Sequence, residues 1–205
     1  MSLKLLTPAS APAVSLADAK LHLRVDVTDD DALITALIDA ATQDAEHLMG
    51  RAVMPQQWQL TLDSFISTPT QYGTYVPAVQ ALKLQRPPVT SVVSVKYVDS
   101  VTGTLTTLDP SLYQFVSGSN YTASIVPAYG KSWPTARAQP EAVQVIFATG
   151  YADAASVPAP IIAWIKLRVG ALYENRESIV VGQRLVSIEL PFVDTLLDRF
   201  RTFLT

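Results

Sequence analysis

The side chains that could carry out chemistry are few and far apart. The 205-residue chain has two histidines, His22 and His47, and no cysteine. Neither histidine has a second histidine at the spacing of a metal site, and Glu46 lies directly beside His47. A serine hydrolase would have to recruit one of these histidines, and both lie in segments with helical spacing. We therefore interpret both as helix-surface residues and predict neither a metal site nor catalytic residues.

An acidic cluster, made of Asp26 and of Asp29, Asp30 and Asp31, precedes a segment with helical spacing. A calcium loop would also need a glycine and a closing glutamate at fixed positions, and both are missing here. Carboxylates stabilise the first turn of a helix because they interact with its free N–H groups. Helix capping is the simpler interpretation, and we expect a helix to begin at this cluster.

The sequence shows no loop typical of nucleotide binding or of hydrolases. The eight glycines are scattered, and Gly118 and Gly130 lack the strand-to-helix context of a phosphate-binding loop. The run Ser117-Gly118-Ser119 does not form a nucleophile elbow. We predict no cofactor and no enzyme activity.

Two features suggest contacts with other proteins. Glu174, Arg176 and Glu177 follow an apolar helical segment. They form either an ordinary polar helix end or a charged contact between subunits, in which arginine binds carboxylates bidentately. Trp133 lies in a loop-like segment, where it either packs against its own sheet or anchors an interface. Both alternatives stay open at this point.

The composition is that of a folded protein that is not exported. Hydrophobic residues make up 49% of the chain, which is enough to bury a core. No apolar run reaches the length of about 18 residues that a membrane span needs, and the N-terminus is too short and proline-interrupted for a signal peptide. The absence of cysteine excludes disulfides and suits a reducing cytoplasm.

The charge pattern argues against tight binding to nucleic acid. The net charge is -3, and residues 1–50 hold three basic side chains against eight acidic ones. Proteins that grip duplex DNA concentrate Lys and Arg into a patch, and no such block is recognisable in the sequence.

The N-terminal part shows helical spacing. Ser15 can cap a short helix that runs to about residue 25, because Asp18 lies three residues further on. A longer helix should follow the acidic cluster and end at Gly50. Its apolar stripe is predicted to consist of Leu33, Leu37, Ala41, Ala45 and Leu48, flanked by Ile34 and Ile38.

The middle of the chain alternates apolar and polar residues, which is typical of half-buried strands. The alternating sets are Trp58/Leu60/Leu62, Val93/Val95/Tyr97, Tyr113/Phe115 and Val143/Val145/Phe147. Thr102-Gly103 indicates a turn. Residues 64–78 and 117–140 are rich in Ser, Thr, Pro, Tyr and Gly, and we expect long loops there. The strands should form a small antiparallel sheet.

Helical spacing returns after Pro158 and Pro160. One stripe contains Ile161, Ile165, Val169 and Leu172, and a second contains Trp164, Leu167 and Ala171. A helix that is apolar on most of its circumference should lie centrally or face a neighbouring subunit. A closing amphipathic helix is predicted after Pro191, with Phe200 on its apolar side and Arg201 on its polar side.

These elements predict an α+β fold. A helical bundle should be built from the N- and C-terminal helices, residues 1–52 and 158–205, with a β-rich antiparallel insertion with long loops over residues 53–157.

Several segments, read in order, resemble the head-tail connector (adaptor) proteins of long-tailed bacteriophages, prophages and gene transfer agents. The strongest match is the run VSLADAKLHLRV at residues 14–25, followed by DDDALI at 29–34. Further segments are GRA at 50–52, WQL at 58–60, LQRPPV at 84–89, PAYGKSWP at 127–134, VQVIFATGY at 143–151, VPAPI at 157–161 and LYENRE at 172–177. The resemblance covers essentially the whole chain.

The resemblance implies a structural protein of the virion neck, present in the host cytoplasm during assembly. Such a protein forms a dodecameric ring below the portal protein, extends the DNA channel and offers its far side to a stopper or tail-completion protein. DNA passes through without tight sequence-specific binding, and the free chain is either a monomer or already a ring. The family docks its C-terminal region on the portal, which implies a contact near residues 190–205. We predict the following interface residues: Trp133, Trp164, Glu174, Arg176, Glu177, Phe200 and Arg201.

A binding module is the alternative. The β-rich insertion would then recognise a small ligand or carbohydrate through Trp58, Tyr129 and Trp133.

Overall fold

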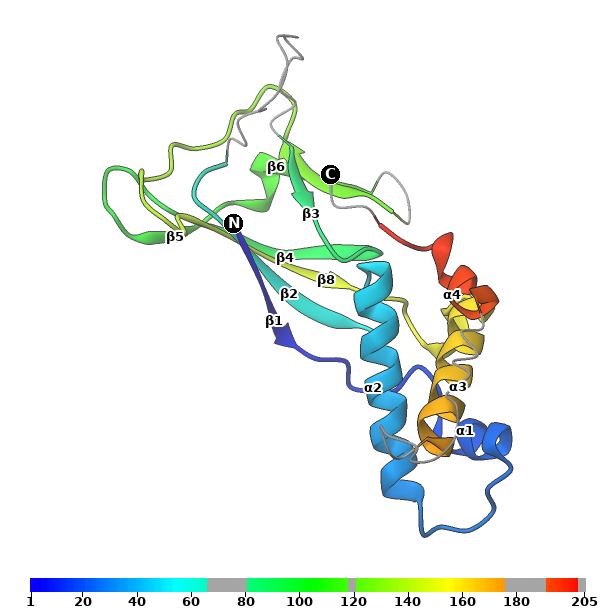
Figure 1. Cartoon of the computed structure of the whole chain (residues 1–205). Helices are drawn as coiled ribbons and strands as arrows, with labels where there is room; N and C mark the ends of the chain where they lie inside the picture. The colour runs from blue at the N-terminus through cyan, green and yellow to red at the C-terminus, as the bar shows by residue number, and fades with distance from the viewer. Residues whose placement is uncertain (66–80, 118–120, 176–190, 203–205) are drawn as a thin grey trace. The chain divides into compact units, whose positions relative to one another are not determined.

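The chain forms two compact units (Figure 1). A computed structural model describes residues 1–65, 81–117, 121–175 and 191–202. The β-rich unit comprises Met1–Ala9 and Pro55–Gly150, and the helical unit comprises Ser10–Met54 and Tyr151–Thr205. Helices together with antiparallel sheets confirm the predicted α+β class.

The start of the chain differs from the prediction, which placed all of residues 1–52 in the helical part. Ser2–Thr7 form strand β1 of the β-rich unit. This strand pairs with the strand β2, so that Leu3 lies opposite Leu60 and Leu5 opposite Trp58. Leu3 also packs against the core of that unit. Backbone pairing and this packing together account for the difference.

The β-rich unit contains two antiparallel sheets rather than the single predicted one. The five-stranded sheet has the order β1-β2-β8-β4-β5, and the three-stranded sheet has the order β3-β7-β6. The remaining strands are β2 (Gln56–Leu62), β3 (Leu82–Leu84), β4 (Val89–Val98), β5 (Leu105–Thr107), β6 (Tyr113–Ser117), β7 (Ala123–Pro127) and β8 (Val143–Thr149). Short 3-10 turns cover Pro110–Leu112 and Ala154–Ser156.

The central strand β8 organises the core of this unit. Val143, Val145 and Phe147 are fully buried and alternate with half-buried residues, as predicted. Val145 lies opposite Leu60 of β2 on one side and opposite Val95 of β4 on the other. Three strands therefore contribute buried apolar side chains to one layer.

Strand β4 departs from the predicted alternation at Val93, whose side chain is 52% exposed. The register with β8 shifts between Val92 and Ser94, so that Val93 is the extra residue of a β-bulge. Val92 packs against the core in its place. The prediction that Val93 points inward was wrong because the bulge interrupts the period of two.

The predicted loop over residues 117–140 contains a strand, β7. Ile125 of this strand is fully buried and lies between Leu82 of β3 and Phe115 of β6. Pairing on both sides stabilises a segment whose composition alone is typical of a loop. The other predicted loop, residues 64–78, lies almost entirely outside the described residues.

The helical unit contains α1 (Leu16–Leu23), α2 (Asp31–Met49), α3 (Ala159–Glu174) and α4 (Pro191–Asp198). Ser15 caps α1 as predicted, because its hydroxyl accepts the N–H of Asp18 at 3.1 Å. Gly50 ends α2 in a left-handed conformation with φ +66°, which glycine adopts without steric cost.

Helix α2 buries a stripe that is rotated from the predicted one. The buried residues are Ile34, Ile38, Ala41, Ala45 and Met49. The predicted members at positions 33 and 37 are only partly buried, and position 48 is 41% exposed. The β-branched residues expected to flank the stripe lie at its centre.

Helix α3 buries one stripe and leaves most of the second outside. Ile161, Trp164, Ile165 and Val169 are buried, whereas Leu167 is 37% exposed. Among the described residues, no helix is long and apolar enough to cross a membrane.

Candidate assembly surfaces

The two histidines lie on helix surfaces. His22 is in the last turn of α1 and His47 is in the last turn of α2, and both side chains are exposed. Within the described ranges, no three His, Cys, Asp or Glu side chains gather in a way that could hold a metal ion.

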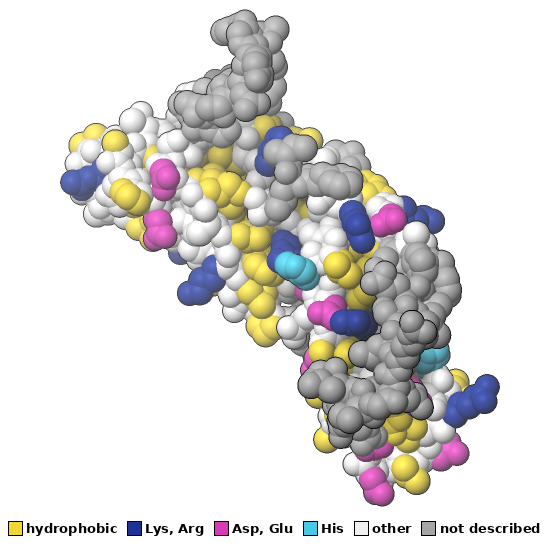
Figure 2. Space-filling view, viewed as in Figure 1, with side chains coloured by type: hydrophobic (Ala, Val, Ile, Leu, Met, Phe, Trp, Pro, Cys, Tyr) yellow, Lys and Arg dark blue, Asp and Glu magenta, His cyan; other side chains and the backbone are white. Residues whose placement is uncertain are grey.

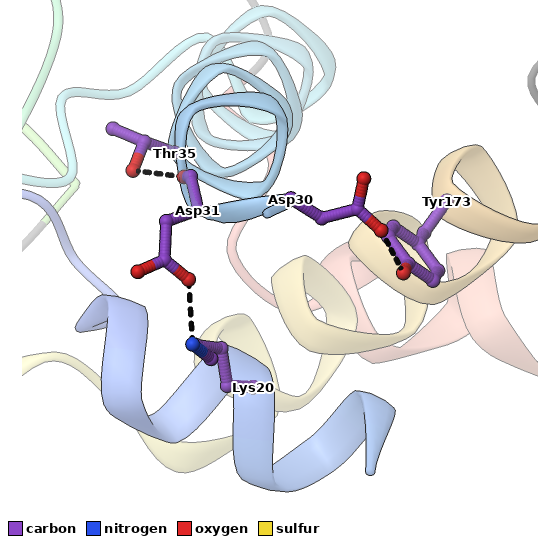
Figure 3. Close-up of polar contacts among 5 residues, drawn as sticks. All are labelled: Lys20, Asp30, Asp31, Thr35 and Tyr173. Atoms are coloured by element: carbon purple, nitrogen blue, oxygen red, sulfur yellow. Dashed lines mark hydrogen bonds and ion pairs between the residues drawn. The ribbon is translucent and has the colours of Figure 1, made fainter. Parts of the chain in front are cut away.

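Two residues of the acidic cluster, Asp30 and Asp31, link the start of α2 to α1 and α3 (Figure 3). Lys20 Nζ of α1 forms an ion pair with Asp31 Oδ1 at 2.6 Å. Tyr173 of α3 donates its hydroxyl to Asp30 Oδ2 at 2.5 Å. Asp30 is the N-cap residue of α2 but makes no side-chain capping bond. Helix α2 begins at this cluster, as predicted, with Asp31 in its first turn. The Asp30 carboxylate does not cap the helix but accepts the Tyr173 hydroxyl.

A second ion pair holds α3 against α2. Arg168 donates from Nε and Nη2 to Asp44 Oδ2 at 3.1 and 3.0 Å. Both side chains are nearly half exposed. Together with the contacts at Asp30 and Asp31, this pair links α1, α2 and α3 within the unit.

Three of the predicted interface residues are buried within their own unit. Trp133 is 9% exposed and stacks on Phe65, with the ring centroids 4.8 Å apart. Of the two alternatives for this tryptophan, packing within its own β-rich unit is the one observed. Trp164 and Phe200 belong to the core of the helical unit. Each of these three side chains therefore offers little exposed surface to a partner.

The charged residues that the structure describes among the predicted interface residues are less buried than these three aromatic ones. Glu174 is exposed at the end of α3. Arg201 is partly buried and pairs with Asp198 at 3.2 Å. Arg176 and Glu177 lie outside the described residues. Of the predicted set, Glu174 is thus the described side chain that is most open to a partner.

The most exposed large apolar residues were not among the predicted interface residues. Val101 is 91% exposed and Tyr129 is 99% exposed in the β-rich unit, and Leu21 of α1 is 79% exposed in the helical unit. Val101 directly precedes the turn residue Thr102, and Tyr129 directly precedes Gly130, which has a positive φ. The Thr102-Gly103 turn in the sequence was the available signal for Val101, because the residue before such a pair lies at the tip of a hairpin.

The turn that carries Val101 is held by Asp99. Its Oδ1 accepts the backbone N–H groups of Thr102 at 2.7 Å and of Val101 at 2.9 Å. These bonds favour the charged form and hold the pKa of the Asp99 carboxyl below its ordinary value of 3.8. Gly103 completes the turn with φ +70°. The hairpin between β4 and β5 therefore presents Val101 on a preorganised tip.

The aromatic residues of the ligand-binding alternative do not present their rings together. Trp133 is buried, and the guanidinium of Arg86 lies over the Trp58 ring at 5.0 Å from its centroid. Tyr129 is exposed. Two of the three rings are thus already in contact with the protein's own side chains.

Charges are mixed on the viewed face. Figure 2 shows Lys and Arg side chains interspersed with Asp and Glu, and hydrophobic side chains between them. A surface of this kind lacks the concentrated positive potential that holds duplex DNA.

One family model matches the chain. Residues 13–83 match the family described as phage gp6-like head-tail connector protein. The matched segment contains α1, α2 and β2 and ends within β3. The resemblance to phage head-tail connector proteins that the sequence indicated is confirmed by this match. No curated protein sequence matches the chain.

Solved structures of gene transfer agent (GTA) particles contain the same fold. A chain from the neck of an empty GTA particle, computed with C6 symmetry, is 23% identical with a TM-score of 0.75. A chain from the virion of a native particle is 22% identical with a TM-score of 0.74, and one from a native neck with C12 symmetry is 21% identical with a TM-score of 0.72. Each comparison covers 100% of this chain and 97% of the other.

Proposed function

We propose that this chain, which resembles phage head-tail connector proteins, is a structural protein of a virion neck. The observation that carries the proposal is the match of residues 13–83 to the head-tail connector family. The fold supports it, since chains from GTA necks share it over the full length. In this role the protein links the head to the tail by binding, without catalysing a reaction.

The proposed assembly is a ring of identical subunits below the portal protein. A closed ring requires two different surfaces on each subunit, which meet head to tail. The helical unit supplies a braced surface with exposed Leu21, Leu167 and Glu174, and the β-rich unit supplies the tips with Val101 and Tyr129. The C6 and C12 symmetries of the related particles favour six or twelve copies.

The proposed ring has a protein partner on each side. The portal protein lies on the head side, and a stopper or tail-completion protein lies on the tail side. DNA passes through the pore, and a lining that bound it tightly would oppose its movement. The net charge of -3 and the scattered basic residues agree with passage rather than retention.

The test is to mix the purified chain with the portal protein of the same genome. Native mass spectrometry gives the number of subunits, and electron microscopy gives the symmetry. We expect a second ring stacked on the portal. A folded chain that leaves the portal ring unchanged at micromolar concentrations of both proteins would refute the proposal.

Two variants separate specific docking of the subunits from non-specific adhesion through exposed apolar side chains. Leu21→Asp and Val101→Asp place a charge at two exposed positions in different units, where neither substitution disturbs a core. Loss of ring formation in one variant and its retention in the other would identify the unit that makes the contact. Equal behaviour of both variants and the wild-type chain would exclude these two side chains from the interface.

A further inference from the structure

The segment that follows helix α4 is fastened to the C-terminal end of helix α2. The backbone N–H of Thr202 donates to the carbonyl of Met49 at 2.8 Å. The Thr202 hydroxyl lies 3.0 Å from the same carbonyl and 3.1 Å from that of Gly50. The last carbonyls of a helix have no partner within the helix, so they need hydrogen-bond donors from elsewhere, as Thr202 provides here. Thr202 therefore closes the end of α2.

The same segment contributes two side chains to the helical core. Leu197 is fully buried and Phe200 is 5% exposed, and both belong to the core cluster that includes Met49. The carbonyl of Phe200 accepts a hydrogen bond at 3.3 Å from Nη1 of Arg51, a side chain that is itself 1% exposed. Apolar burial and hydrogen bonds thus hold the segment at the same place.

The absence of a side chain at Gly50 leaves the space that Thr202 occupies. An added Cβ at Gly50 would lie 2.8 Å from the Thr202 hydroxyl oxygen, which is closer than real Cβ contacts. Glycine is needed here for its positive φ and also for the approach of Thr202. The fit between Gly50 and Thr202 makes this a specific contact rather than a loose covering of apolar surface.

We infer that residues 197–202 act as a C-terminal clasp, which must be seated on residues 49–51 for the helical unit to be closed. Leu197 and Phe200 are part of the unit's own core, so displacing the clasp would expose both apolar side chains. While the clasp is seated, this part of the chain exposes the side chains of Thr195, Asp198 and Arg199. This inference does not depend on the proposed function.

Hydrogen exchange on the full-length chain tests the clasp directly. Thr202→Val removes the hydroxyl and keeps the side-chain shape, and Thr107→Val in strand β5 is the matched control at an exposed position. We expect Thr202→Val to speed amide exchange at residues 49–51 and 200–202 by about 3- to 10-fold, the effect of one hydrogen bond. Strand β8 and the control should keep wild-type rates. Unchanged exchange at residues 49–51 in Thr202→Val would overturn the inference.

Two truncations test the same point at a larger scale. A chain that ends at residue 202 keeps the clasp, and a chain that ends at residue 196 lacks it. We expect the first to melt like the full chain and the second to melt earlier or to lose the α2 and α3 protection seen by hydrogen exchange. Equal melting of the two truncated chains would overturn the inference whether or not the portal is bound.

Discussion

At the scale of single residues, the hydroxyl of Tyr173 offers a clean test of the contact between α3 and the start of α2. Tyr173→Phe removes the donor to Asp30 and leaves the ring in place. Hydrogen bonds to charged groups contribute more than neutral ones, so we expect the free energy of unfolding to fall by about 1–2 kcal/mol in urea denaturation. The matched control is Tyr129→Phe, at a ring that is 99% exposed, which should change stability by less than about 0.5 kcal/mol. Equal effects would contradict the role of this bond.

Asp99 predicts a dependence on pH. Its folded-state pKa lies below the ordinary value of 3.8, first because it accepts the N–H of Thr102 and then that of Val101. The stabilisation by the carboxylate is therefore present above about pH 3.8 and is lost as the pH falls through the folded-state pKa. Asp99→Asn keeps an acceptor but removes the charge. We expect its stability deficit, measured by urea unfolding, to shrink below pH 3.8. A deficit that is constant over this range would show that the charge does not contribute.

At the scale of elements, the bulge in β4 separates two valines that the sequence treats alike. Val95 is fully buried and Val93 is 52% exposed. Val95→Ala should lower the free energy of unfolding by about 2 kcal/mol through lost burial and a cavity, and Val93→Ala by less than about 0.5 kcal/mol. Chemical denaturation of the two variants gives the comparison. Equal losses would contradict the register between β4 and β8.

The bulge also illustrates why some elements could be predicted from the sequence and others could not. Strand β8 and helix α3 were predictable because an uninterrupted period records which residues face the core. An inserted residue such as Val93 shifts the period without a local signal, since it depends on pairing with β8. Strand β7 was missed for a related reason, because its stability comes from partners on both sides. Likewise, the burial of Trp133 depends on Phe65, which is remote in sequence.

At the scale of the whole molecule, the sequence indicated a helical part and a β-rich part but not how the chain passes between them. Strand β1 begins the β-rich unit, and the chain then crosses to the helical unit at Ser10. A short apolar segment such as residues 3–6 has no periodicity of its own, so only its pairing with β2 assigns it. The resemblance to head-tail connector proteins was recognisable from the sequence alone, because its strongest segment falls within residues 13–83, the part that matches the family model.

Ring formation gives the prediction that belongs to the whole molecule. Glu174 is exposed at the end of α3, and the side chains of Arg168 and Tyr173 link α3 to α2, so a partner would meet a carboxylate on a helix that is held in place. If this carboxylate pairs with a cation of the neighbouring subunit, reversing its sign creates repulsion at every contact of the ring. Glu174→Arg should then weaken each contact between neighbouring subunits about tenfold or more, which corresponds to about 1.4 kcal/mol per contact. Glu174→Gln, which removes the charge without reversing it, should have a smaller effect, and both variants should keep the wild-type melting temperature.

Native mass spectrometry over a range of salt concentrations measures the assembly. If Glu174→Arg formed rings as readily as the wild-type chain, Glu174 would be excluded from the subunit interface, and assembly would have to depend on other exposed side chains such as Leu21 and Val101.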